Sequence, residues 1–85
     1  MAGVTLYTRR NCPLCDEAAR LLRPLAPEFG LEVEEVDIGC DAVLLERYRD
    51  SIPVIALDGE PLLSAPLPEA QVRAVLARHR RAHRS

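Results

Sequence analysis

Two cysteines three positions apart, Cys12 and Cys15, constrain this chain more than any other feature of its sequence. They follow an apolar run typical of a strand and precede a pattern typical of a helix that begins at Pro13. Cys12 is therefore expected at the N-cap, where unpaired backbone N–H groups and the helix dipole favour a thiolate. Cys15 is expected one turn along the same face, close enough to form a disulfide. Dithiol–disulfide exchange needs this combination of an activated nucleophile and a resolving thiol.

The length and composition of the chain indicate one small domain, residues 1–85. Of its 85 residues 48% are hydrophobic and 28% are charged, which is ordinary for a globular protein. The net charge of -2 gives no basis for binding nucleic acid, and no apolar run is long enough to span a bilayer. The N-terminus lacks the layout of a signal peptide. We therefore expect a cytoplasmic monomer that binds neither nucleic acid nor membrane.

The hydrophobic pattern predicts alternating strands and helices along the chain. Strands are predicted at residues 4–8, 31–38, 52–57 and 61–63, and helices at residues 13–23, 41–49 and 67–83. Pro24 is expected to kink or end the first helix. Asp41 is a plausible N-cap of the second helix, and Asp58-Gly59 predicts a two-residue hairpin turn.

The predicted order is β-α-β-α-β-β-α, which gives an α/β fold. The first two strands, joined by a helix, are expected to run parallel, and the last two form an antiparallel hairpin. Together they predict a four-stranded mixed sheet with helices on both faces. The apolar positions of the second strand, residues 31, 33, 36 and 38, slip phase midway. That slip suits a strand covered on both faces or one that carries a bulge.

This order, with the CxxC at the first strand–helix junction and Ile52-Pro53-Val54 opening the third strand, resembles the thioredoxin fold. The run from Leu6 to Cys15 is similar to the glutaredoxin branch, in which proline follows the first cysteine. The resemblance implies that Cys12 attacks a disulfide, that Cys15 resolves the mixed disulfide, and that Pro53 is the cis-proline beside them.

The resemblance also implies a set of substrate-binding residues around the dithiol: Arg9, Pro13, Leu14, Ile52 and Pro53. Arg9 stands where glutaredoxins often place a lysine that contacts the carboxylate of glutathione, and the forked guanidinium of arginine suits a carboxylate well. No cofactor is implied beyond the redox-active dithiol itself. The implied partners are a protein or low-molecular-weight disulfide substrate and a reductase or thiol donor.

One stretch departs from the glutaredoxin pattern. Glutathione-using glutaredoxins carry a Gly-Gly turn and a polar cap after the hairpin, whereas this chain reads Leu-Leu-Ser-Ala-Pro-Leu-Pro-Glu over residues 62–69. Ser64 and Glu69 are candidate substitutes for the cap. The chain thus resembles small glutaredoxin-like proteins that keep the dithiol and lack the glutathione signature, and we expect glutathione to be a poor partner.

Two classes of function remain open from the sequence. One is a thiol–disulfide oxidoreductase, and the other is a non-catalytic module that docks to a partner or binds a metal or iron–sulfur cluster. A closed zinc site needs four ligands, and the candidates beyond the CxxC are Cys40, His79 and His83. The favoured role for Cys40 is that of a small apolar filler dispensable for redox chemistry, and for the two histidines that of a solvated helix end.

Overall fold

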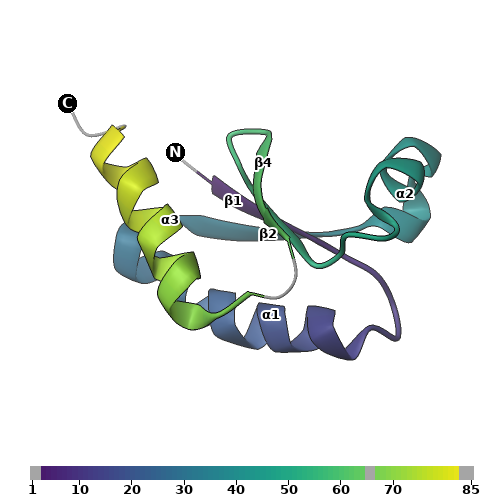
Figure 1. Ribbon diagram of the computed structural model, residues 1–85, viewed down its shortest axis with the longest axis horizontal. Helices are drawn as coiled ribbons and strands as arrows, with labels where there is room; N and C mark the ends of the chain where they lie inside the picture. Colours follow the sequence, from purple (N-terminus) through teal and green to yellow (C-terminus); the bar gives the residue numbers. More distant parts are fainter. Residues whose placement is uncertain (1–2, 65–66, 83–85) are drawn as a thin grey trace.

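The computed structural model describes residues 3–64 and 67–82 (Figure 1). The strands are β1 (Gly3–Thr8), β2 (Glu32–Asp37), β3 (Val54–Leu57) and β4 (Glu60–Ser64), and the α-helices are α1 (Pro13–Leu25), α2 (Ala42–Tyr48) and α3 (Glu69–Ala82). Two short 3-10 helices, η1 (Ala26–Phe29) and η2 (Ile38–Cys40), follow α1 and β2. The order predicted from the sequence is confirmed. His83, one of the proposed histidine pair, lies outside the described residues.

The four strands form one mixed sheet in the order β2-β1-β3-β4. β1 pairs in parallel with β2, and the intervening α1 provides the long crossover that parallel neighbours require. β3 pairs antiparallel with both β1 and β4. Asp58 and Gly59 join β3 to β4 with φ angles of 51° and 81°, the left-handed conformation that a tight hairpin turn needs.

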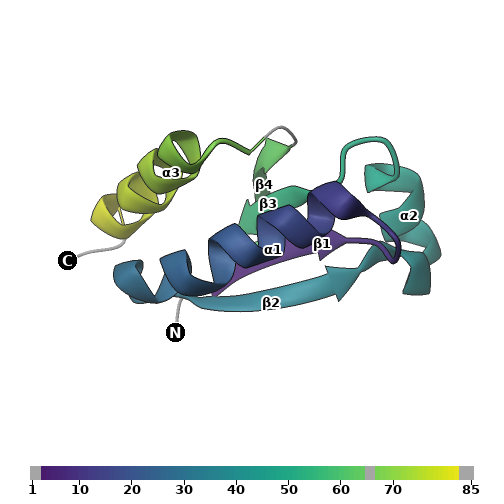
Figure 2. The same ribbon diagram turned by 90° about the horizontal axis from the view of Figure 1, so that it is seen from below.

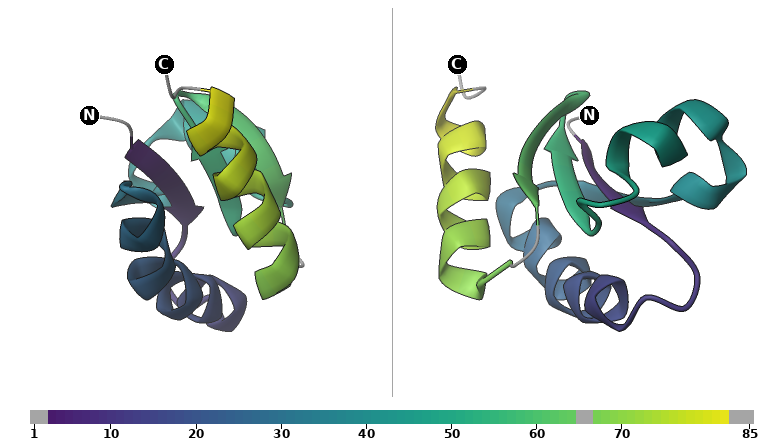
Figure 3. Two further views of the ribbon diagram at one scale, coloured as in Figure 1. Left: turned by 90° about the vertical axis from the view of Figure 1, so that its left-hand side faces the viewer. Right: turned by 45° about the vertical axis from the view of Figure 1, so that its right-hand side comes forward.

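Helices cover both faces of the sheet, as predicted. Because side chains alternate along a strand, Leu6 of β1 packs beneath α1 and α3, while the adjacent Tyr7 faces the side on which α2 lies. The views in Figures 2 and 3 show α1 lying along the sheet and α2 at one end of it, away from α3. The main core therefore lies between the sheet and α1 with α3, and a smaller one lies under α2.

The smaller core holds the end of the sheet at which β1 leads into α1. Ile38, Tyr48 and Val54 are its buried members, and the rings of Tyr7 and Tyr48 stack with centroids 4.6 Å apart. Asp41 caps α2 as predicted, because its carboxylate accepts hydrogen bonds from the backbone N–H groups of residues 43 and 44. This packing fixes the segment that leads through residue 52 into β3.

Of the two explanations offered for the phase slip in the second strand, the structure excludes the bulge. β2 is an edge strand with three exposed and three partly buried residues, and its pairing with β1 runs without a bulge. Leu31 and Val33 pack against the main core, whereas Ile38, just beyond the strand, is buried in the smaller one. The phase slip therefore records a segment that contributes to opposite faces at its two ends.

The first helix also runs farther than its sequence predicts. α1 continues through Pro24 to Leu25 before the chain tightens into η1. Leu22 and Leu25 are buried in the main core. Pro24 has no backbone N–H, so the helix loses one hydrogen bond there, and the burial of the neighbouring Leu22 and Leu25 offsets that loss.

An ion pair joins α1 to the edge strand β2. The guanidinium of Arg23 donates from Nε and Nη2 to the two carboxylate oxygens of Glu35, at 2.7 and 2.9 Å. This forked contact lowers the pKa of Glu35, chiefly through the hydrogen bond from Arg23. Because both groups are partly exposed, solvent screens their attraction, and the pair contributes little to the stability of the fold.

We predict that Glu35→Gln lowers the free energy of unfolding at neutral pH and has little effect in acid. A carboxyl group whose pKa is depressed by folding stabilises the fold above its ordinary value of 4.5, and that contribution is lost as the pH falls through the folded-state pKa. Urea denaturation of both proteins at pH 7 and near pH 3 measures the difference. An equal loss of stability at both pH values would contradict the assignment.

Candidate active site

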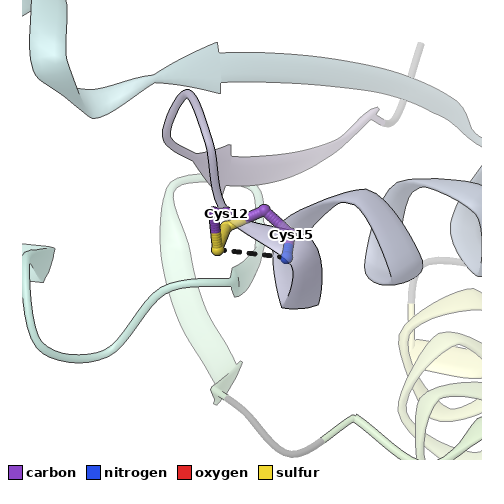
Figure 4. The surroundings of a disulfide bond; sticks show 2 residues. All are labelled: Cys12 and Cys15. Atoms are coloured by element: carbon purple, nitrogen blue, oxygen red, sulfur yellow. Dashed lines mark hydrogen bonds between the residues drawn. A yellow bond between two sulfur atoms is a disulfide. The ribbon is translucent and has the colours of Figure 1, made fainter.

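Cys12 is the N-cap of α1, as its place before Pro13 predicts. Its backbone is extended, with φ -117° and ψ 101°, and its carbonyl accepts the hydrogen bond from the N–H of Asp16. Its Sγ accepts a hydrogen bond from the backbone N–H of Cys15 at 3.2 Å (Figure 4). Asn11, with φ 58°, turns the chain from β1 into this position. The sulfur thus faces the positive end of the helix dipole, where a thiolate is stabilised.

The two cysteines form a disulfide, and their Cα atoms are 5.2 Å apart. Cys15 is only 2% exposed, whereas Cys12 is half-buried. Of the two cysteines, Cys12 is therefore the one that a group approaching from solvent can reach. Cys15 lies behind it in the first turn, within the distance from which it can displace a bound partner.

Pro53 and Leu14 lie on one groove beside the dithiol. The Ile52–Pro53 peptide bond is cis, as expected, and Pro53 is fully buried, while Ile52 packs in the smaller core. The groove has a volume of about 270 Å³. Its lining combines one face of α1 with Pro53 and the residues before α3: Leu14, Glu17, Ala18, Leu21, Pro53, Leu67 and Pro68.

Several of these lining residues were not among the predicted site residues. The spacing of positions 14, 18 and 21 places them on one helical face, and that signal was present in the sequence. The contribution of Leu67 and Pro68 had no local signal, because it depends on how α3 approaches α1.

Arg9 lies apart from the groove. It lines a separate depression of about 290 Å³ with Arg10, Asp37, Gly39 and Cys40. Arg10 reaches the carboxylate of Asp37 at 3.9 Å, and Asp37 accepts a hydrogen bond from the N–H of Gly39 at 2.8 Å. The structure therefore brings Leu14 and Pro53 together and places Arg9 on another flank.

The expectation that Cys40 acts as a small apolar filler was wrong. Cys40 is a free, exposed thiol at the end of η2. The core position in this segment belongs to Ile38, because a short 3-10 turn can direct only part of its surface inward.

The structure also describes Ser64 and Glu69, the two candidate substitutes for the glutathione cap. Ser64 is exposed at the end of β4, and Glu69, the first residue of α3, is bound to Arg73 at 2.9 Å. Within residues 3–64 and 67–82, no three His, Cys, Asp or Glu side chains are grouped so that they could hold a metal ion. The described helices include none that is both long and apolar enough to cross a membrane.

Solved structures with the same architecture define the fold as a thioredoxin fold. A thioredoxin of Halobacterium salinarum superimposes with a TM-score of 0.72 at 17% identity, covering 91% of this chain and 73% of that one. A structural-genomics target from X. campestris has a TM-score of 0.73 at 32% identity, covering 88% of this chain and 96% of that one. Protein Ne2328 from Nitrosomonas europaea has a TM-score of 0.73 at 26% identity, covering 87% and 89%.

Sequence comparison places the chain more narrowly. The model of the family described as "Glutaredoxin-like domain (DUF836)" matches residues 3–77. The uncharacterized protein Rv0508 of Mycobacterium tuberculosis is 31% identical over 80 residues, covering 88% of this chain and 82% of that protein. The chain therefore belongs to the glutaredoxin-like DUF836 family.

We predict that the pKa of the Cys12 thiol in the reduced protein lies below the ~8.5 of a free cysteine. The reason is the N-cap position of Cys12, where the helix terminus stabilises the thiolate. Each unit by which the pKa falls corresponds to about 1.4 kcal/mol in favour of the thiolate. The measurement is the ultraviolet absorbance of the thiolate as a function of pH in a Cys15→Ser, Cys40→Ser protein. The same protein in denaturant is the control, and identical titration curves in the two states would refute the prediction.

Proposed function

We propose that this protein is a dithiol thiol–disulfide oxidoreductase that reduces disulfides of polypeptide substrates. The observation that carries the proposal is the first turn of α1. There the half-buried Cys12 accepts a hydrogen bond from a backbone N–H at its sulfur, and the buried Cys15 lies next to it. The membership of this protein in a glutaredoxin-like family also supports thiol–disulfide exchange.

The reaction proceeds in two exchanges of sulfur partners. The Cys12 thiolate attacks one sulfur of the substrate disulfide, forming a mixed disulfide and releasing the other substrate sulfur as a thiolate, which takes up a proton. The Cys15 thiol loses its proton and attacks Sγ of Cys12, releasing the second substrate thiolate. Two electrons have then passed to the substrate, and the Cys12–Cys15 disulfide remains. An external thiol or dithiol donor reduces that disulfide and completes the cycle.

The backbone around the site supports distinct roles for the two cysteines. The hydrogen bond to Sγ of Cys12 strengthens when the sulfur carries a charge, because charge-assisted bonds are stronger than neutral ones. Cys15 is only 2% exposed, and a charge on a side chain so far removed from water is costly. Cys12 is accordingly the nucleophile and the better leaving group.

The test is turnover by cysteine variants in a Cys40→Ser background, with insulin as the disulfide substrate and dithiothreitol as the donor. We expect Cys12→Ser to abolish turnover, and Cys15→Ser to accumulate a mixed disulfide with the substrate, visible by mass spectrometry without reducing agent. Cys40→Ser alone should retain full activity and the Cys12–Cys15 disulfide. Persistent turnover in Cys12→Ser, or a linkage between Cys40 and either site cysteine in peptide maps of the unmutated protein, would overturn the assignment.

We also predict that glutathione is a poor partner of this site. The Gly-Gly turn is absent from the sequence, Glu69 is bound to Arg73, and the groove beside Leu14 contains the carboxylate of Glu17, which repels the two carboxylates of glutathione. A glutathionylated peptide should be reduced more slowly than the same peptide closed by an internal disulfide. Saturable dependence on glutathione at a high rate would contradict this, and Arg9→Ala would then identify the carboxylate contact.

A further inference from the structure

The groove beside the dithiol has the dimensions of a site for one side chain. Its volume of about 270 Å³ falls just below the roughly 300–1,000 Å³ of sites for whole small molecules. Three large apolar side chains are exposed in the described part of the chain, those of Leu14, Val43 and Leu62. Of these, Leu14 lines the groove and is 57% exposed. An apolar group that covered it would remove apolar surface from water at the point where a substrate sulfur must approach.

Glu17 gives this apolar groove a negative charge. Six of its seven lining residues are apolar, and Glu17 is the seventh. None of the ion pairs between described residues includes Glu17. Glu69, the acidic residue at the start of α3, is already paired with Arg73 and lines a different depression.

The opposite charge lies on the other flank. Arg9 and Arg10 line the depression that contains Cys40, together with Asp37, which lies 3.9 Å from Arg10. One positive charge remains in excess there, and the depression shares no lining residue with the groove. An anionic group is therefore favoured on the Arg9 flank and disfavoured in the groove, where a cationic group is favoured.

From these observations we infer that the groove selects the polypeptide substrate, with Glu17 as the residue that determines its charge preference. The preferred substrate carries an apolar residue next to the reacting cysteine, seated against Leu14, and a basic residue beyond it, paired with Glu17. This inference rests on the proposed function, because it assigns the substrate class of the same dithiol. It adds a selection by charge and by apolar surface that the cysteines themselves do not provide.

Four synthetic peptides test the inference, each closed by one internal disulfide and identical except around one cysteine. On each side of that cysteine, the adjoining residue is Leu or Ser and the next residue outward is Arg or Glu, which gives the peptides Leu/Arg, Leu/Glu, Ser/Arg and Ser/Glu. Because the two sides are the same, the direction in which the peptide binds does not matter. The fully reduced Cys40→Ser protein is mixed with each peptide in a single turnover. Alkylation at timed intervals and mass spectrometry give the rate at which the protein dithiol is oxidised.

We expect the Leu/Arg peptide to react about two- to fivefold faster than the Leu/Glu peptide, the range typical of an exposed ion pair. This difference should shrink at high salt, which screens exposed charges. Glu17→Gln should bring the two rates close together, and Glu17→Arg should reverse their order. The matched control is Glu46→Arg on α2, an exposed site outside the groove with the same change of charge, which should leave the ratio unchanged.

The apolar contact has its own pair of variants. Leu-flanked peptides should react about threefold or more faster than Ser-flanked ones, because part of the leucine leaves water in the groove. Leu14→Ser should reduce that ratio, whereas Val43→Ser, which removes an exposed apolar residue on α2, should not. Each variant is judged by the ratio of its rates with two peptides, so a change in the intrinsic reactivity of Cys12 affects both rates equally and cancels.

The outcomes separate this inference from the proposed function. If all four peptides oxidise the dithiol at one rate and Glu17→Arg changes nothing, the groove does not select substrates, and the oxidoreductase proposal stands. If none of the peptides oxidises the dithiol, the proposed function itself fails. Circular dichroism of each variant verifies folding, and the salt dependence of the unmutated protein tests the charge preference without any substitution.

Discussion

The burial of one side of α1 against the sheet is the interaction on which the site depends. Val4 and Leu6 of β1 and Leu22 of α1 are all fully buried in the main core, and each such side chain contributes about 1.5–3 kcal/mol when it leaves water. This contact fixes the helix axis along the sheet. The N-terminal turn of α1 is thereby held at the edge of the fold, with Cys12 accessible and Cys15 facing inward.

A second, smaller set of contacts positions the opposite wall of the site. The stacked rings of Tyr7 and Tyr48 hold α2 against the end of β1, and Ile52 packs beside them. The next residue, Pro53, is therefore placed at the groove by a core that contains neither cysteine. The two clusters share the sheet, so the dithiol and Pro53 are supported by packing on opposite faces.

The chemistry of the dithiol follows from unequal surroundings of two identical side chains. Cys12 is half-buried and accepts a hydrogen bond from the backbone at its sulfur, whereas Cys15 is only 2% exposed. The helix terminus favours charge on the first sulfur, while the low polarity around the second disfavours it. Charges of opposite sign lie on the two flanks, with Glu17 in the groove and Arg9 beyond it, and we infer that they discriminate between substrates of the proposed reaction.

The sequence by itself determined the features that depend on a few consecutive residues. The N-cap at Cys12, the reach of Cys15 and the hairpin turn at residues 58–59 all follow from local backbone preferences. The tertiary structure decided the edge position of β2, the exposure of Cys40 and the joining of Leu67 to α1 in one groove. These depend on which elements pack together across the fold, and local preference carries no information about contacts between residues far apart in the chain.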